Sequence, residues 1–239
     1  DKATGNELWR RPREEPTGWT TPFILERGGR TEAMINGTRR IRSYDLATGD
    51  LIWECGGMTL NAVPSPAVGP DLAYFTSGFQ GSALLALRLG GKGDLTGSAA
   101  IAWQRGRGTP YVPSPLLYGD LLYVLAGNNA VLTCLDALTG KVHYETQRLP
   151  GMKGMYASPV GVADRVYLAG REGKTTVIRR SPQLEILACN ALDDRFDASP
   201  AVVGDALFLR GRTSVYCLAE TPGGSPCRSR NTVHFGLRE

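Results

Sequence analysis

The sequence predicts an all-β fold, a β-propeller of four-stranded antiparallel blades. First, a Ser/Thr-Pro dipeptide recurs every 41 to 49 residues, with its prolines at positions 22, 66, 115, 159 and 200. Second, turn residues, an aromatic residue and a glycine follow the last four prolines in the same order. Third, apolar residues show no helical periodicity. Four short strands per repeat of this length are typical of a propeller blade, whereas the repeats of a β-helix solenoid, the alternative, are shorter.

The third repeat shows the four strands most clearly. Short apolar runs predict strands at 115–118, 121–126, 131–136 and 141–146. Gly119-Asp120 separates the first two runs and is a hairpin signal. A proline opens the first strand, which is tolerated because the first residue of a strand need not donate to the ladder.

The same order of signals, repeated along the chain, extends the predicted propeller over residues 1–220. It predicts blades at 18–54, 61–105, 111–147, 155–192 and 196–220, with an orphan outer strand at 1–11. Residues 221–239 break the repeat and are rich in Gly, Pro, Ser and Arg. This composition predicts a disordered basic tail.

A second motif, Asp-x-x-Thr-Gly followed by an aromatic residue, closes several repeats. It stands in "DKATGNELW" (1–9), "YDLATGDLIWE" (44–54) and "CLDALTGKVHYE" (134–145). Thr-Gly allows the positive φ of a tight turn between the third and fourth strands. A large flat ring can fill the gap between tilted sheets.

This motif resembles the pyrroloquinoline-quinone (PQQ) type repeat of quinoprotein dehydrogenases and of the outer-membrane-assembly lipoprotein. The resemblance implies that each aromatic residue packs on the Thr-Gly peptide of the next blade. It also implies a periplasmic or secreted protein. The blade-docking residues it indicates are Trp9, Trp53, Trp103, Tyr144, Gly5, Gly49 and Gly140.

The chain departs from the pattern in several places. Residues 90–100 form an insertion in the second repeat, Ser181-Pro182 replaces Thr-Gly in the fourth, and the fifth stops after three strands. Proteins with this repeat usually carry seven or eight blades. We therefore expect an incomplete, C-terminal part of a larger propeller whose remaining blades are missing from this chain. Residues 1–11 either close the fifth blade or belong to an earlier one.

Composition excludes several functions. The net charge is +4, and the arginines are scattered among acidic residues, so no nucleic-acid partner is expected. No apolar run is long enough for a transmembrane segment. Five cysteines without a Cys-x-x-Cys pair, and only two histidines, argue against a zinc site.

Propellers place ligands where two sets of loops meet on one face. One set leads into the first strand of each blade, and the other consists of the B–C turns between its second and third strands. Solvated turn residues without a ligand are the alternative interpretation. The candidate ligand-binding residues are Trp19, Asn36, Asn61, Tyr111, Asn128, Asn129, Tyr156, Arg171, Asp197 and Arg212.

Two functions remain open at this stage. The first is a non-catalytic propeller, a rigid scaffold that binds a protein partner or a small polar envelope ligand. The second is a fragment of a PQQ- and calcium-dependent dehydrogenase. The resemblance implies that such enzymes use a calcium ion held by Glu, Asn and Asp, and often adjacent cysteines. The sequence has no Cys-Cys pair, and Asp197 is the only acid among the candidates. We therefore expect no catalytic residue, no metal and no cofactor.

Overall fold

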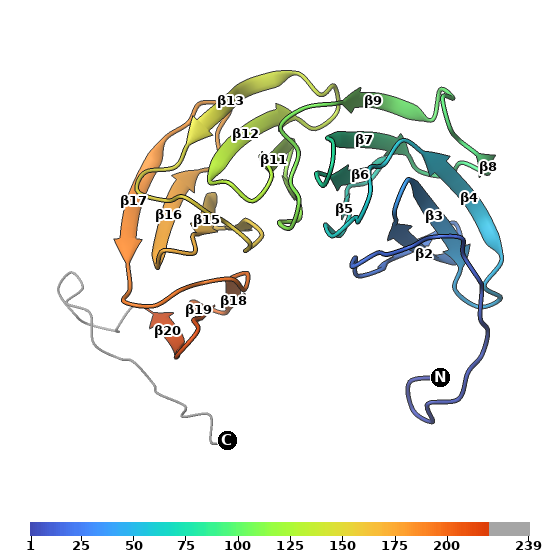
Figure 1. Cartoon of the computed structure of the whole chain (residues 1–239), viewed down its shortest axis with the longest axis horizontal. Coiled ribbons are helices and arrows are strands. Elements are labelled where there is room, and N and C mark those ends of the chain that lie inside the picture. Colours follow the sequence, from blue (N-terminus) through green and yellow to red (C-terminus); the bar gives the residue numbers. More distant parts are fainter. Residues whose placement is uncertain (220–239) are drawn as a thin grey trace. The chain divides into compact units, whose positions relative to one another are not determined.

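The computed structural model describes residues 1–219, and within them all regular structure is β-strand. The strands form five sheets, one for each predicted repeat (Figure 1). In the third repeat the observed strands lie within two residues of the predicted ones. Pro66, Pro115, Pro159 and Pro200 each stand directly before the first strand of a sheet. The all-β fold of antiparallel propeller blades is therefore confirmed.

The chain divides into two compact units, the first of which comprises residues 1–111 with 138–140. Its first sheet has the order β1-β2-β3-β4-β8 and its second the order β5-β6-β7-β9. The strands are β1 (Phe23–Arg27), β2 (Arg30–Asn36), β3 (Arg40–Asp45), β4 (Leu51–Gly56), β5 (Ala67–Val68), β6 (Leu72–Ser77), β7 (Ala83–Arg88), β8 (Gly93–Asp94) and β9 (Ile101–Arg105).

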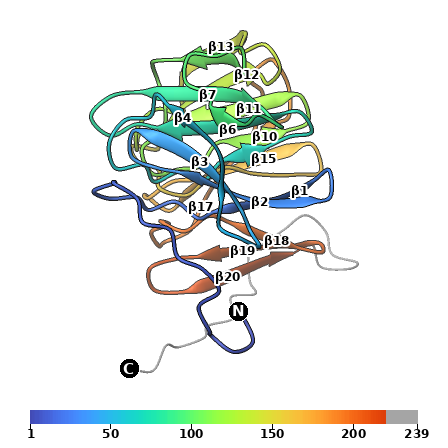
Figure 2. The same ribbon diagram turned by 90° about the vertical axis from the view of Figure 1, so that its right-hand side faces the viewer.

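The second unit comprises residues 112–137 and the chain from 141 onward. Its sheets have the orders β10-β11-β12-β13, β14-β15-β16-β17 and β18-β19-β20, and Figure 2 shows the last three as neighbouring strands. The strands are β10 (Leu116–Tyr118), β11 (Leu121–Leu125), β12 (Val131–Asp136), β13 (Val142–Arg148), β14 (Val160–Val162), β15 (Arg165–Ala169), β16 (Lys174–Arg179), β17 (Ile186–Ala191), β18 (Ala201–Val203), β19 (Ala206–Arg210) and β20 (Val215–Ala219).

The hydroxyl of the Ser-Pro dipeptide explains why this marker recurs. Ser158 Oγ accepts a hydrogen bond from the backbone N–H of Ser114, the equivalent residue one blade earlier, at 2.9 Å. Ser199 Oγ accepts from Ser158 N–H in the same way at 2.9 Å, and Ser65 Oγ accepts from Thr21 N–H at 3.2 Å. Each serine thus satisfies a backbone donor that the first strand of the preceding blade would otherwise leave unpaired.

The Asp-x-x-Thr-Gly motif forms a tight turn closed by its own aspartate. The carboxylate of Asp45 accepts the backbone N–H groups of Ala47 and Thr48, and the Asp45 carbonyl accepts Gly49 N–H. Gly49 has φ +73°, and a Cβ there would lie 2.6 Å from the Trp9 ring. A Cβ at Gly140 would likewise lie 2.6 Å from Trp103. Glycine therefore provides both the backbone conformation and the flat surface on which the indole packs.

The predicted outer strand at residues 1–11 is corrected by the structure, in which no strand of the described chain precedes Phe23. The segment still docks on the first blade. Trp9 packs on Gly49 and donates its indole N–H to the Leu46 carbonyl at 2.9 Å. Arg11 donates to the Gly49 carbonyl at 2.7 Å. Gly5 forms the same turn with φ +74°, and no atom lies within 4 Å of its Cβ position.

The insertion at residues 90–100 adds a strand that the sequence did not predict. Strand β8 pairs in parallel with β4, with Trp53 opposite Gly93. Leu95 is buried, and its N–H donates to the Glu54 carbonyl at 2.8 Å. Thr96 Oγ1 accepts Gly56 N–H at 2.8 Å. The insertion therefore covers the outer edge of the first blade, an edge that would otherwise expose unpaired backbone groups.

Apolar side chains from facing sheets form the core of each unit. In the first unit Trp53, from β4, meets Phe75, from β6, edge to face at 6.2 Å between ring centroids. In the second unit Tyr123, Leu132 and Leu168 belong to one buried cluster. Cys134 is buried in the same cluster, and burial raises the pKa of its thiol to about 12. This thiol therefore packs as a small apolar group.

The predicted basic tail at 221–239 lies outside the described residues, as does Cys227. The other cysteines, at 55, 134, 189 and 217, are free thiols.

Candidate functional site

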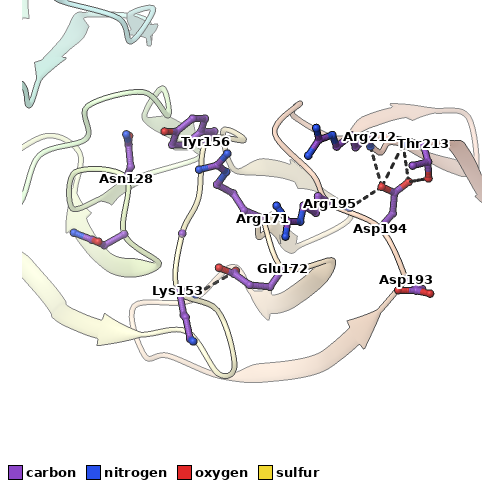
Figure 3. A pocket seen from close by; sticks show the side chains of 12 residues that line it. Asn128, Lys153, Tyr156, Arg171, Glu172, Asp193, Asp194, Arg195, Arg212 and Thr213 are labelled. Atoms are coloured by element: carbon purple, nitrogen blue, oxygen red, sulfur yellow. Dashed lines mark hydrogen bonds between the residues drawn. The ribbon is translucent and has the colours of Figure 1, made fainter.

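An open pocket of about 880 Å³ lies on the loop face of the second unit (Figure 3). It is formed by the loops that lead into β14 and β18 and by the B–C turns of the three blades. Its lining residues are Asn128, Asn129, Lys153, Gly154, Tyr156, Arg171, Glu172, Asp193, Asp194, Arg195, Arg212 and Thr213.

Backbone hydrogen bonds join these loops into a continuous strip. Met155 N–H donates to the Asn128 carbonyl at 2.8 Å, and Arg171 N–H donates to the Gly154 carbonyl at 3.0 Å. At the other end of the pocket, Arg212 N–H donates to the Arg195 carbonyl at 3.0 Å. Each loop thus satisfies polar groups of its neighbour, and these bonds connect the loops without regular secondary structure.

Arg171 is fixed by residues from two different loops. Its guanidinium lies 4.0 Å from the centre of the Tyr156 ring, in cation–π geometry. Its Nε donates to Asp197 Oδ1 at 2.6 Å. Because Tyr156 precedes β14 and Asp197 precedes β18, this single side chain links the loops of two adjacent blades.

Asp194 organises the B–C turn of the last described blade. Its carboxylate accepts hydrogen bonds from four backbone N–H groups and two hydroxyls, at 2.7 to 3.3 Å. Partial burial acts to raise the pKa of Asp194, but the hydrogen bonds outweigh it and lower that pKa to about 2. The donors are the N–H groups of Arg195, Arg212, Thr213 and Ser214 and the hydroxyls of Thr213 and Tyr216.

We expect Asp194 to make stability depend on acid pH. Its pKa is lower in the folded than in the unfolded chain, so its contribution is complete above about pH 4 and is lost as the pH falls toward 2. The difference in unfolding free energy between wild type and Asp194→Ala should therefore shrink over this range. Urea unfolding at a series of pH values measures it. A difference that stays constant from pH 5 to 2 would contradict the assignment.

The other charged groups of the pocket are unevenly distributed. Arg195, Arg212 and Lys153 form no ion pair within residues 1–219. Glu172 accepts the backbone N–H of Lys153 at 3.2 Å. Figure 3 shows Arg195 and Arg212 extending toward Arg171, whereas Asp193 points away from them. Arg195 and Arg212 consequently present positive charge to the pocket that no ion pair within residues 1–219 neutralises.

A separate chain of hydrogen-bonded aromatic residues lies in the first unit. The Trp19 indole N–H donates to Asn61 Oδ1 at 2.7 Å, and Asn61 Nδ2 donates to the Tyr111 hydroxyl at 2.8 Å. Tyr111 stacks on Phe79 with 5.1 Å between ring centroids. Trp19 remains 67% exposed.

The predicted site residues lie in three environments: the pocket, a group in the first unit, and, for Asn36 alone, a buried position. Asn128, Asn129, Tyr156, Arg171 and Arg212 line the pocket, and Asp197 holds Arg171. Trp19, Asn61 and Tyr111 lie in the first unit.

Asn36 is buried, with its amide donating to the carbonyls of Pro64 and Thr76 at 2.9 and 2.7 Å. We therefore assign it a structural role.

Sequence reasoning missed seven of the twelve lining residues because it selected only one or two residues from each loop. The missed residues include Arg195 and Asp194. The run "LDDR", residues 192–195, was the available signal, since three consecutive charged residues begin two residues after the end of a strand. The missed lining residues are Lys153, Gly154, Glu172, Asp193, Asp194, Arg195 and Thr213.

A calcium site like that of a quinoprotein dehydrogenase would need acidic side chains grouped around the ion. Within the described chain no three His, Cys, Asp or Glu side chains cluster as metal ligands. In the pocket itself, the Asp194 oxygens already accept internal donors and Asp193 points away.

The repeating blades, the Thr-Gly turns and the indoles packed on their glycines define a β-propeller of the PQQ-like repeat class. Residues 38–185 match the family described as outer membrane protein assembly factor BamB. This match spans more than half of the chain, and the chain therefore belongs to that family. The family resemblance inferred from the Thr-Gly motif is confirmed.

Solved structures show the same fold. BamB from Moraxella catarrhalis superposes with a TM-score of 0.59 at 17% sequence identity, covering 84% of this chain and 57% of that one. The computationally designed Ika8 protein superposes with a TM-score of 0.56 at 10% identity, covering 85% and 57%. The chain thus spans little more than half the length of either protein.

Among curated proteins, no sequence matches the chain. In the part of the chain that the structure describes, there is no helix with the length and apolar character needed to cross a membrane.

Proposed function

We propose that this chain is a non-catalytic binding module that holds a protein partner against its loop face in the bacterial envelope. The observation that carries the proposal is the pocket of the second unit. Its loops are connected by backbone hydrogen bonds and by Arg171, which contacts both Tyr156 and Asp197. A rigid, polar concavity suits recognition because little conformational entropy is lost on binding. Family membership supports a protein partner and a periplasmic or secreted location, in a role connected with outer-membrane assembly.

Site-specific photo-crosslinking tests this function. A photoreactive phenylalanine derivative replaces Asn129, which is exposed in the pocket, in the full-length protein in its own host cell. Asn190 provides the matched control because it is also exposed but lies on the outer strand β17. We expect discrete protein adducts from position 129 and none from position 190. Equal adducts from both positions, or none from position 129, would overturn the proposal.

A titration with PQQ separates this proposal from a quinoprotein dehydrogenase. We expect no saturable binding at micromolar concentration, even with calcium added, because the acids near the pocket do not form a metal site. Quinone absorbance and protein fluorescence follow the titration. Saturable binding at or below micromolar concentration would favour the dehydrogenase.

A further inference from the structure

The charges of the pocket indicate what kind of segment it binds. The Asp194 carboxylate binds the backbone N–H groups of Arg195 and Arg212, and it accepts six donors in all from its own loops. None of these donors is a guanidinium. Asp194 therefore positions the backbone of both arginines without pairing with their side chains.

Three guanidiniums face the same space. Figure 3 shows the side chains of Arg195 and Arg212 directed toward Arg171. Arg171 is paired with Asp197, whereas Arg195 and Arg212 have no ion-pair partner in the described chain. Like charges brought together repel each other, and an incoming anion removes this repulsion. A guanidinium also presents a planar pair of donors that matches a carboxylate.

The remaining lining favours a peptide over a phosphate-rich ligand. Glu172 lies in the same pocket and would repel a phosphate dianion. A carboxylate carries only one negative charge and can bind at a position farther from Glu172, where the repulsion is weaker. Asn128 and Asn129 offer amide groups that suit a peptide backbone. Asn128 Oδ1 accepts Val112 N–H at 3.0 Å, which fixes the orientation of this amide.

We infer that the pocket binds an extended segment of the partner protein whose Asp or Glu side chain enters between Arg195 and Arg212. This inference rests on the proposed function and adds the chemistry of the recognised segment. Arg171 and Tyr156 form the wall beside this carboxylate, and Asn128 lies farther along the segment.

Peptide binding measured by fluorescence anisotropy tests the inference. The probe is a labelled short peptide in which Asp and Glu alternate with Gly and Ser, and its control carries Asn and Gln in place of the acids. We expect the acidic peptide to bind at least about tenfold more tightly than the amide peptide, with an affinity that falls as salt is added. Equal affinities, or no binding of either peptide, would overturn the inference.

A double variant locates the interaction. Arg195→Gln with Arg212→Gln should weaken the acidic peptide about tenfold or more. The matched control, Arg88→Gln with Lys92→Gln, removes the same charge from exposed positions of the first unit and should leave affinity unchanged. Circular dichroism checks that both variants fold. If both variants lose the same affinity for the acidic peptide, the effect comes from the net charge of the protein and not from the pocket, which would contradict the inference.

Inorganic phosphate as a competitor distinguishes the other ligand class. Phosphate and acetate are compared as competitors of the acidic peptide. If phosphate displaces the peptide at a far lower concentration than acetate does, the pocket is specific for phosphate groups and the inference is overturned. The proposed function has its own readout, since protein adducts from position 129 can appear whether or not the bound segment is acidic.

Discussion

Replacing Trp53 with alanine is expected to lower the free energy of unfolding by about 3 to 5 kcal/mol. Trp53 is only 3% exposed and meets Phe75 of the next sheet edge to face. Its backbone also lies opposite Gly93, where the insertion pairs with β4. Removing the indole would therefore leave a cavity between two sheets at the point where a third segment docks.

Urea unfolding followed by circular dichroism measures this effect. Trp19→Ala is the matched control because the same side chain is lost from a position that is 67% exposed. We expect the control to change stability by less than about 1 kcal/mol. An unfolding midpoint for Trp53→Ala that equals the wild-type value would show that this ring does not hold the sheets together.

The fold could be predicted because each of its signals recurs with one period. A Ser-Pro pair looks ordinary alone, but its recurrence marks where each blade begins. The structure supplies the physical reason, since the hydroxyls of Ser158 and Ser199 bind the backbone of the preceding blade. Thr-Gly likewise recurs because Gly49 and Gly140 must accept an indole where any Cβ would clash.

Features that occur once could not be predicted in this way. Strand β8 comes from an insertion without periodicity, and it pairs with residues about forty positions earlier. In the N-terminal segment Trp9 packs on Gly49, although the predicted strand does not form. In both cases contacts with the first blade determine the conformation, and local sequence does not encode them.

The candidate site shows a similar division. Blade topology placed Asn128, Tyr156 and Arg212 on one loop face, and in the structure they line one pocket. It could not show that Asn36, in a comparable position by sequence, is buried with its amide bound to two carbonyls. Nor could it show that the Asp194 carboxylate is occupied by internal donors, because this depends on the three-dimensional course of the turn.

Gly173→Ala is expected to destabilise the chain by about 2 to 4 kcal/mol and to distort the pocket. Gly173 has φ +79°, which alone disfavours any other residue. A Cβ at this position would also lie 2.3 Å from the Leu192 carbonyl oxygen and 2.4 Å from that of Asp194. Both contacts are with backbone, so no side-chain rotation can relieve them, and the segment that positions Arg195 must move.

Gly204→Ala separates the two causes. Gly204 also has positive φ, +56°, but no atom lies within 4 Å of its Cβ position. This control should therefore show only the conformational cost, about 1 kcal/mol. Thermal and urea unfolding compare the two variants. From the backbone contacts we expect Gly173→Ala to lose more stability than Gly204→Ala and to bind the acidic peptide more weakly than the wild type. If both variants lose the same stability, the close approach of residues 192–194 to Gly173 is not what holds the pocket loops in place.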